Sequence, residues 1–138
     1  MDHRADSLFD VRLIQRRVKS LARQLKQEDF TIATTPRGDG SPYVEVADAY
    51  YFVVEERGVE LERRKTADLD ELLYWILEGL TSSMAWDHEL RHRREGEDFR
   101  RQGFAKQIEL LSLLSVDWAE RRKAEQAEVQ AQHPFSDG

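Results

Sequence analysis

The apolar residues of this chain change their spacing twice, and this change most constrains its fold. Over residues 5–27 they recur every three or four positions, which is typical of an amphipathic helix. Residues 30–64 instead hold short β-branched and aromatic runs separated by turn residues, which favour antiparallel strands. From Thr66 onward the helical spacing returns. The sequence therefore predicts an α+β fold: an N-terminal helix, an antiparallel sheet of three to four strands, a long central helix, and one or two C-terminal helices packed on it.

The length of the chain limits its organisation, because 138 residues suffice for one substantial core. We expect a single domain over residues 1–138, divided into a helix (1–28), an antiparallel sheet (29–65), a helical part (66–132) and a tail (133–138). Gly96 should break the helical part, and Pro134 should end the last helix, which frees Phe135 to pack back into a groove. The N-terminus lacks an apolar signal and no apolar run is long enough to span a membrane, so we expect a cytoplasmic protein without membrane contacts.

The strands are expected at residues 30–35, 43–46, 50–56 and 59–64, with a turn at 36–42. Arg57 and Gly58 stand where the two-residue loop of a hairpin belongs. If Glu56 faces Val59, then Val54 faces Leu61 on one side of the ribbon.

On the other side of the ribbon, the same register places Glu55 opposite Glu60, with Glu62 next to them on the same face. The net charge of −6 arises within residues 51–90, which hold four basic and ten acidic side chains. The hairpin is then either an exposed edge kept unpaired by its charge or a surface prepared for a basic partner. An acidic chain also argues against nucleic acid as a partner.

The predicted first helix carries six basic side chains and allows a second reading, in which this face binds phosphate groups. A regulatory protein of that kind would bind nucleic acid in a salt-sensitive way. A solvated helix face explains the same pattern without a partner.

Residues His88-Glu89-Leu90-Arg91-His92 match the H-E-x-x-H spacing of zinc peptidases. A zinc-dependent hydrolase using His88, Glu89 and His92 is therefore the alternative function. The extended form of the motif would need Gly and His where this chain has Glu95 and Asp98. Several arginines surround the pattern, so we expect an exposed, basic helix end rather than a metal site. Asp98 is expected to pair with Arg94 or Arg101 across the break at Gly96.

The last two-thirds of the chain hold several short segments whose order and spacing match a known family. They are ERG (56–58), TADLDELLYW (66–75), Met84-Ala85 before an acidic turn, EDFRR (97–101), Phe104, Gln107 and the closing HPFSDG. In this arrangement the chain resembles the immunity protein 63 family of bacterial polymorphic toxin systems. An aromatic residue often stands in that family where this chain has His88, which places His88 outside any shared metal site.

The resemblance implies a protein without enzymatic activity that binds a cognate toxin domain, encoded by the adjacent gene, and neutralises it by occlusion. It implies no cofactor and no metal, and it leaves a homodimer open. We expect the toxin to act in the cytoplasm, and the basic groove of a nuclease toxin would complement the acidic residues 51–90. The predicted partner-binding residues are Glu55, Glu56, Glu60, Glu62 and Trp86. Reversing the charges of Glu60 and Glu62 should weaken toxin binding without unfolding the protein.

Overall fold

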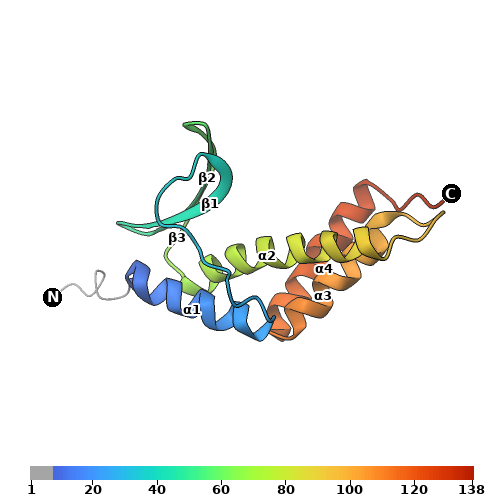
Figure 1. Cartoon of the computed structure of the whole chain (residues 1–138), viewed down its shortest axis with the longest axis horizontal. Helices are drawn as coiled ribbons and strands as arrows, with labels where there is room; N and C mark the ends of the chain where they lie inside the picture. Colours follow the sequence, from blue (N-terminus) through green and yellow to red (C-terminus); the bar gives the residue numbers. More distant parts are fainter. Residues whose placement is uncertain (1–7) are drawn as a thin grey trace. The chain divides into compact units, whose positions relative to one another are not determined.

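The computed structural model describes residues 8–138, and within that range it confirms the predicted α+β fold (Figure 1). An N-terminal helix is followed by a three-stranded antiparallel sheet and three further helices. The elements are α1 (Val11–Gln24), β1 (Asp39–Val46), β2 (Tyr50–Glu56), β3 (Val59–Thr66), α2 (Leu69–Arg91), α3 (Phe99–Ser112) and α4 (Val116–Gln132). The predicted start of the first helix at residues 5–7 lies outside the described residues. None of the helices in residues 8–138 is long and apolar enough to cross a membrane.

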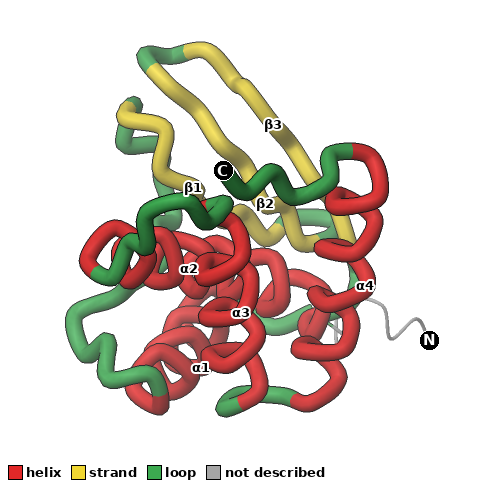
Figure 2. The backbone as a smooth tube through the Cα atoms, turned by 90° about the vertical axis from the view of Figure 1, so that its right-hand side faces the viewer, coloured by secondary structure: helices red, strands yellow, loops and turns green. Residues whose placement is uncertain are grey.

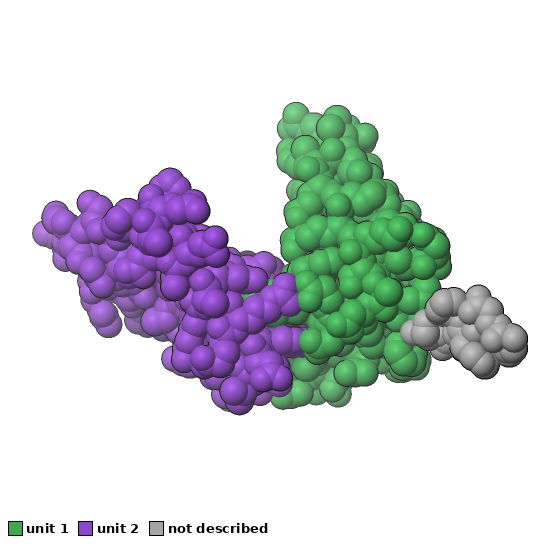
Figure 3. All heavy atoms as spheres, turned by 180° about the vertical axis from the view of Figure 1, so that it is seen from behind, with its two compact units in different colours: residues 1–76 green, residues 77–138 purple. Residues whose placement is uncertain are grey.

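The chain divides into two compact units, residues 1–76 and residues 77–138 (Figure 3). The first unit holds α1, the sheet and the beginning of α2, and the second holds the rest of α2 with α3 and α4. The expectation of a single domain over residues 1–138 stays a prediction.

The sheet of the first unit has the strand order β1-β2-β3, and both strand pairs are antiparallel (Figure 2). The predicted strand at residues 30–35 is wrong, because only Ala33 forms a bridge, parallel to Tyr43. Ile32 and Ala33 are both buried, so consecutive side chains face the protein and the alternation that a strand requires is absent. The predicted turn at residues 36–42 is shorter than expected, since β1 already begins at Asp39.

The turn between β2 and β3 is the predicted two-residue hairpin loop. Arg57 and Gly58 have φ angles of 53° and 80°, and two successive positive values are typical of a type I′ turn. Glu56 pairs with Val59 across this turn, as the sequence predicts.

Beyond the turn the predicted register is wrong by one residue. Glu55 pairs with Glu60 as expected, but Val54 then pairs with Glu62 instead of Leu61. The register shift between Val54 and Glu55 leaves Leu61 as the extra residue of a β-bulge. Because neighbouring residues of β2 point to opposite faces, Glu62 lies on the other face of the sheet from Glu55 and Glu60.

The core of the first unit lies between α1, the sheet and the start of α2. The buried side chains of α1 recur at helical spacing, at Ile14, Val18 and Ala22. The Tyr50 hydroxyl accepts a hydrogen bond from the Phe9 backbone N–H at 2.8 Å, and the ring of Phe52 packs edge-on against Trp75 at 6.3 Å. One face of β2 is thus fixed to the residue before the cap of α1 and to the beginning of α2.

In the second unit, the helices after Gly96 are two rather than one. Gly96 breaks the helical part with a φ of 79°, as predicted, and α3 begins at Phe99. The Ser115 hydroxyl caps α4 by accepting from the Trp118 N–H at 3.2 Å. Phe99, the first residue of α3, is 51% exposed.

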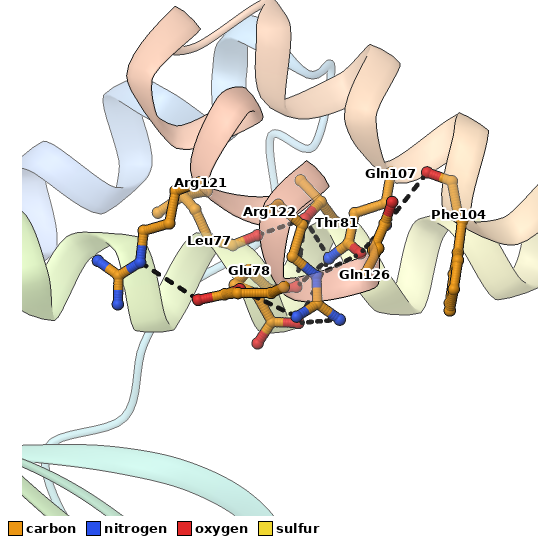
Figure 4. Close-up of polar contacts among 9 residues, drawn as sticks. Leu77, Glu78, Thr81, Phe104, Gln107, Arg121, Arg122 and Gln126 are labelled. Atoms are coloured by element: carbon orange, nitrogen blue, oxygen red, sulfur yellow. Dashed lines mark hydrogen bonds and ion pairs between the residues drawn. The ribbon is translucent and has the colours of Figure 1, made fainter. Parts of the chain in front are cut away.

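A buried polar network joins the three helices of this unit (Figure 4). Gln107 of α3 donates through Nε2 to the carbonyl of Glu78 at 3.0 Å and to the hydroxyl of Thr81 at 3.2 Å, both on α2. Its Oε1 accepts from Arg122 Nε at 2.9 Å and from Gln126 Nε2 at 3.2 Å, both on α4. A single amide therefore bonds to both neighbouring helices.

Candidate functional site

The turn end of the β2–β3 hairpin is the first candidate surface, and we call it the hairpin tip: Glu55, Glu56, Val59, Glu60, Leu61 and Glu62. It combines the four predicted acidic contacts with two exposed aliphatic side chains. Val59 is 60% exposed and Leu61 is 59% exposed. Apolar side chains ringed by charge are the composition that protein–protein contacts use at their centre and rim.

The four acids of the hairpin tip are not equivalent. Glu60 accepts two hydrogen bonds from Arg63, at 2.9 and 3.1 Å, and Glu62 forms an ion pair with Arg64. Among residues 8–138 no ion pair involves Glu55 or Glu56. The acidic character of the tip therefore rests mainly on Glu55 and Glu56.

The arginines that neutralise the other two acids also hold β3 in place. Arg63 donates to Glu45 of β1 at 3.1 Å, and its bonds to Glu60 and Glu45 raise its pKa above the usual value. Arg64 lies over the rings of Phe52 and Trp75, at 4.7 and 5.1 Å from their centres. These two arginines could not be singled out from the sequence, because Glu45, Phe52 and Trp75 lie on β1, β2 and α2, far from β3 along the chain.

Trp86, the fifth predicted contact, belongs to the second unit, whereas the four glutamates belong to the first. Its ring packs against Phe99 at 5.6 Å and Phe104 at 6.3 Å, and it rests on the backbone of Gly103. The side chain is half-buried in this helix packing. Its role in partner binding stays a prediction.

The histidines of the H-E-x-x-H segment lie on one helix face, as their spacing requires. The rings of His88 and His92 stack at 4.2 Å, and burial is the main cause that lowers the pKa of His88. Glu89 is 2% exposed, so the expectation of a fully exposed segment is wrong at this residue.

Both carboxylate oxygens of Glu89 are occupied by a guanidinium. They accept from Arg93 at 2.8 and 3.0 Å, and this bonding lowers the pKa of Glu89. In residues 8–138 no three His, Cys, Asp or Glu side chains lie together in a way that could hold a metal ion. The geometry gives Glu89 a structural ion pair on α2 rather than the position of a general base.

The C-terminal residues 133–138 fold back onto the start of α3, and we call this arrangement the C-terminal clasp. Asp98 caps α3 by accepting from the Arg100 N–H at 2.9 Å, and it also accepts from the Ser136 N–H at 2.8 Å. Phe135 packs on Phe104 at 5.9 Å and lies under Arg101 at 4.5 Å. The side chain thus packs back onto α3, in agreement with the prediction from the sequence.

The predicted pairing of Asp98 with Arg94 or Arg101 is wrong. Asp98 pairs with Arg100 at 3.0 Å, while Arg101 pairs with Asp137 and Arg94 with Glu97. The capping position turns the Asp98 carboxylate towards the tail, and the tail brings its own acid to Arg101. A contact between residues nearly 40 positions apart is invisible in local spacing.

Replacing Asp98 with asparagine is expected to lower the melting temperature at neutral pH by roughly 5–10 °C, because the ion pair with Arg100 and the bond from the Ser136 N–H lose their negative charge. Asparagine caps a helix as well as aspartate does, so the loss reports on these contacts and not on the cap. The bonds from Arg100 and Ser136 hold the pKa of Asp98 well below its usual range. A carboxylate with a lowered folded-state pKa stabilises the protein above its unfolded-state pKa of about 4 and loses this contribution as the pH falls.

The difference in melting temperature between the wild type and Asp98→Asn should therefore shrink as the pH is lowered below about 5, which calorimetry can follow. Asp29→Asn, in the exposed segment after α1, is the matched control and should leave the melting temperature unchanged. A difference that stays constant down to the acid limit would contradict the clasp.

Comparison with known proteins concerns mainly the part of the chain from β2 to α4. A family model described as Immunity protein 63 matches residues 47–128, which confirms the resemblance seen in the sequence. No curated protein and no solved structure matches the chain. The matched range contains the hairpin tip, α2, α3 and most of α4, while α1 and β1 precede it. Since this range covers more than half of the sequence, the chain belongs to the immunity protein 63 family.

Proposed function

We propose that this protein binds a cognate toxin domain acting in the cytoplasm and neutralises it by occlusion, without catalysis of its own. The family match over residues 47–128 carries the proposal, because an immunity protein acts by binding its toxin. The toxin would be the product of the neighbouring gene. Glu89, the acid of the only catalytic pattern noted in the sequence, is engaged by Arg93, which favours a binding role over hydrolysis.

The chemistry of the hairpin tip supports a toxin with a basic groove as the partner. Glu55 and Glu56 supply charge without a competing ion pair in residues 8–138, and Val59 and Leu61 supply exposed apolar area beside them. A basic groove is what a nuclease needs for its substrate, so an acidic tip that enters it would exclude nucleic acid. Opposite charges speed the encounter, and the aliphatic pair adds area that loses water on binding.

The direct test is rescue of growth. The toxin domain of the neighbouring gene is expressed alone and together with this protein, and the pair is then co-purified. Restored growth and a stoichiometric complex are expected. A neighbouring product that neither harms the cell nor binds the protein would overturn the proposal.

Reversing Glu55 and Glu56 to lysine is expected to weaken toxin binding roughly tenfold to a hundredfold, mostly through slower association. These two acids are a cleaner choice than Glu60 and Glu62, because reversing the latter would also break the ion pairs with Arg63 and Arg64. The rate and equilibrium constants can be measured by surface plasmon resonance.

The matched control is the double reversal Glu95→Lys with Glu128→Lys, which makes the same charge change at two exposed glutamates of the second unit. It should bind the toxin nearly as well as the wild type. Circular dichroism melts of both variants check that the fold is intact. Equal affinities for the tip variant, the control and the wild type would remove the hairpin tip from the interface.

A further inference from the structure

One face of α1 is strongly cationic. The helix carries five basic side chains and no acidic one: Arg12, Arg16, Arg17, Lys19 and Arg23. The opposite face is fixed in the core through Ile14, Val18 and Ala22, and Asp10 caps the helix by accepting from the Leu13 N–H at 3.0 Å. The orientation of the helix is therefore set, and its cations are held at the surface.

Part of this face forms a groove with the segment that follows α1. The groove has a volume of about 420 Å³ and is lined by Arg12, Gln15, Arg16, Lys19 and Thr31. Gln15 donates through Nε2 to the backbone carbonyl of Ile32 at 3.3 Å and so ties the two walls together. We call this feature the α1 groove.

The cations of the α1 groove do not stabilise their own helix. Arg12 stands in the first turn, where the helix dipole disfavours positive charge, and Arg16 is four residues further on the same side. Among residues 8–138 no ion pair engages Arg12, Arg16 or Lys19. The one pair that α1 forms within that range joins Arg23 to Glu28 and lies outside the groove.

Helix α4 shows how this protein arranges the cations of a solvated helix. Lys123 pairs with Glu120 at 3.0 Å, and Arg121 pairs with Glu125 at 3.3 Å, each about one helical turn apart. Neighbouring acids of this kind are absent from α1. The contrast favours a source outside residues 8–138 for the negative charge that would complement Arg12, Arg16 and Lys19.

We propose that the α1 groove binds an acidic polypeptide segment of the cognate toxin, an inference that rests on the proposed function. Two observations favour a polypeptide over nucleic acid. The chain has a net charge of −6, which opposes an extended phosphate backbone more than a short acidic segment, because the charge of a phosphate chain continues beyond the groove. The groove is also short, with three cations within eight residues, which matches a few carboxylates rather than a phosphate chain.

The groove also lies outside residues 47–128, the range that matches the family model. The hairpin tip and the α1 groove would thus be two contacts of opposite charge, one inside the matched range and one before it. A protein that complements only one of the two contacts would bind less tightly than a toxin that complements both. The two contacts together therefore add selectivity for the cognate toxin.

The test compares two double variants of the full chain that carry the same charge change. Arg12→Glu with Arg16→Glu alters the groove, and acids in this first turn suit the helix dipole, so the variant should fold. Arg17→Glu with Arg37→Glu reverses two exposed cations of the first unit that lie outside the groove and form no ion pair within residues 8–138, and it is the control. Calorimetric titration of the toxin domain at low salt should show roughly tenfold weaker binding for the groove variant and a small change for the control.

The salt dependence provides a second readout. At about 0.15 M salt the difference between the groove variant and the wild type should narrow, because exposed charges are then screened. Equal toxin affinities for the wild type and the groove variant would overturn the proposed role of the α1 groove, and so would an equal loss of affinity in both variants. Either result would leave the proposed function standing.

A third arm does not depend on the toxin. A short polyglutamate peptide and a single-stranded RNA of matching length are titrated into the wild type and both double variants. The peptide should bind the wild type and lose affinity for the groove variant more than for the control. RNA binding as tight as or tighter than peptide binding, or an absence of peptide binding, would overturn the inference. Failure of the toxin itself to bind the wild type would instead count against the proposed function.

Discussion

Replacing Gly103 with alanine is expected to destabilise the protein by about 3 kcal/mol, at the upper end of the cost of overpacking a core. A Cβ atom on Gly103 would overlap the Trp86 indole, with separations of only 2.7 and 2.9 Å from Cε3 and Cη2. The indole has little room to move away, since Phe99 and Phe104 pack against it. Urea unfolding followed by tryptophan fluorescence measures the free-energy change.

Gly79 provides the matched control, because it also lies inside a helix but has open space where its Cβ would be. Gly79→Ala should stabilise the protein by about 1 kcal/mol through helix propensity alone. The same substitution is thus expected to have opposite signs at the two positions. A Gly103→Ala variant as stable as Gly79→Ala would show that α3 does not approach Trp86 this closely.

The elements that the sequence predicted correctly are those with a local signal. The spacing of Ile14, Val18 and Ala22 predicts α1, and Arg57-Gly58 predicts the hairpin loop, because each pattern needs only residues close in sequence. The prediction at residues 30–35 was wrong because β-branched residues also suit an extended segment that touches the sheet at one point.

The register of β3 depends on contacts that local spacing cannot contain. Arg63 bonds to Glu45 of β1, and Arg64 lies over Trp75 of α2. The bulge at Leu61 is consistent with both contacts, and it moves Glu62 to the opposite face. The acidic residues of the candidate site could therefore be named from the sequence, whereas their faces and their neutralising partners could not.

The contacts of Gln107 in the second unit could not be predicted from local spacing either. Replacing Gln107 with leucine is expected to lower the free energy of unfolding by about 3 kcal/mol. The amide is 3% exposed and bonds to α2 and α4 at once (Figure 4). Leucine has a similar volume, so the loss would come from buried polar groups left without partners rather than from a cavity. Gln130→Leu, on an exposed part of α4, is the control and should change the free energy of unfolding by less than about 0.5 kcal/mol.

A double-mutant cycle separates the network from simple packing. Arg122 Nε–H donates to Gln107 Oε1 at 2.9 Å, so Gln107→Leu leaves the Nε–H of Arg122 without this acceptor. Adding Arg122→Met then removes that N–H group. The double variant should be more stable than the sum of the two single losses predicts, by about 1 kcal/mol or more. Additive losses would mean that Gln107 and Arg122 stabilise the second unit independently of each other, and that the bond between them does not contribute.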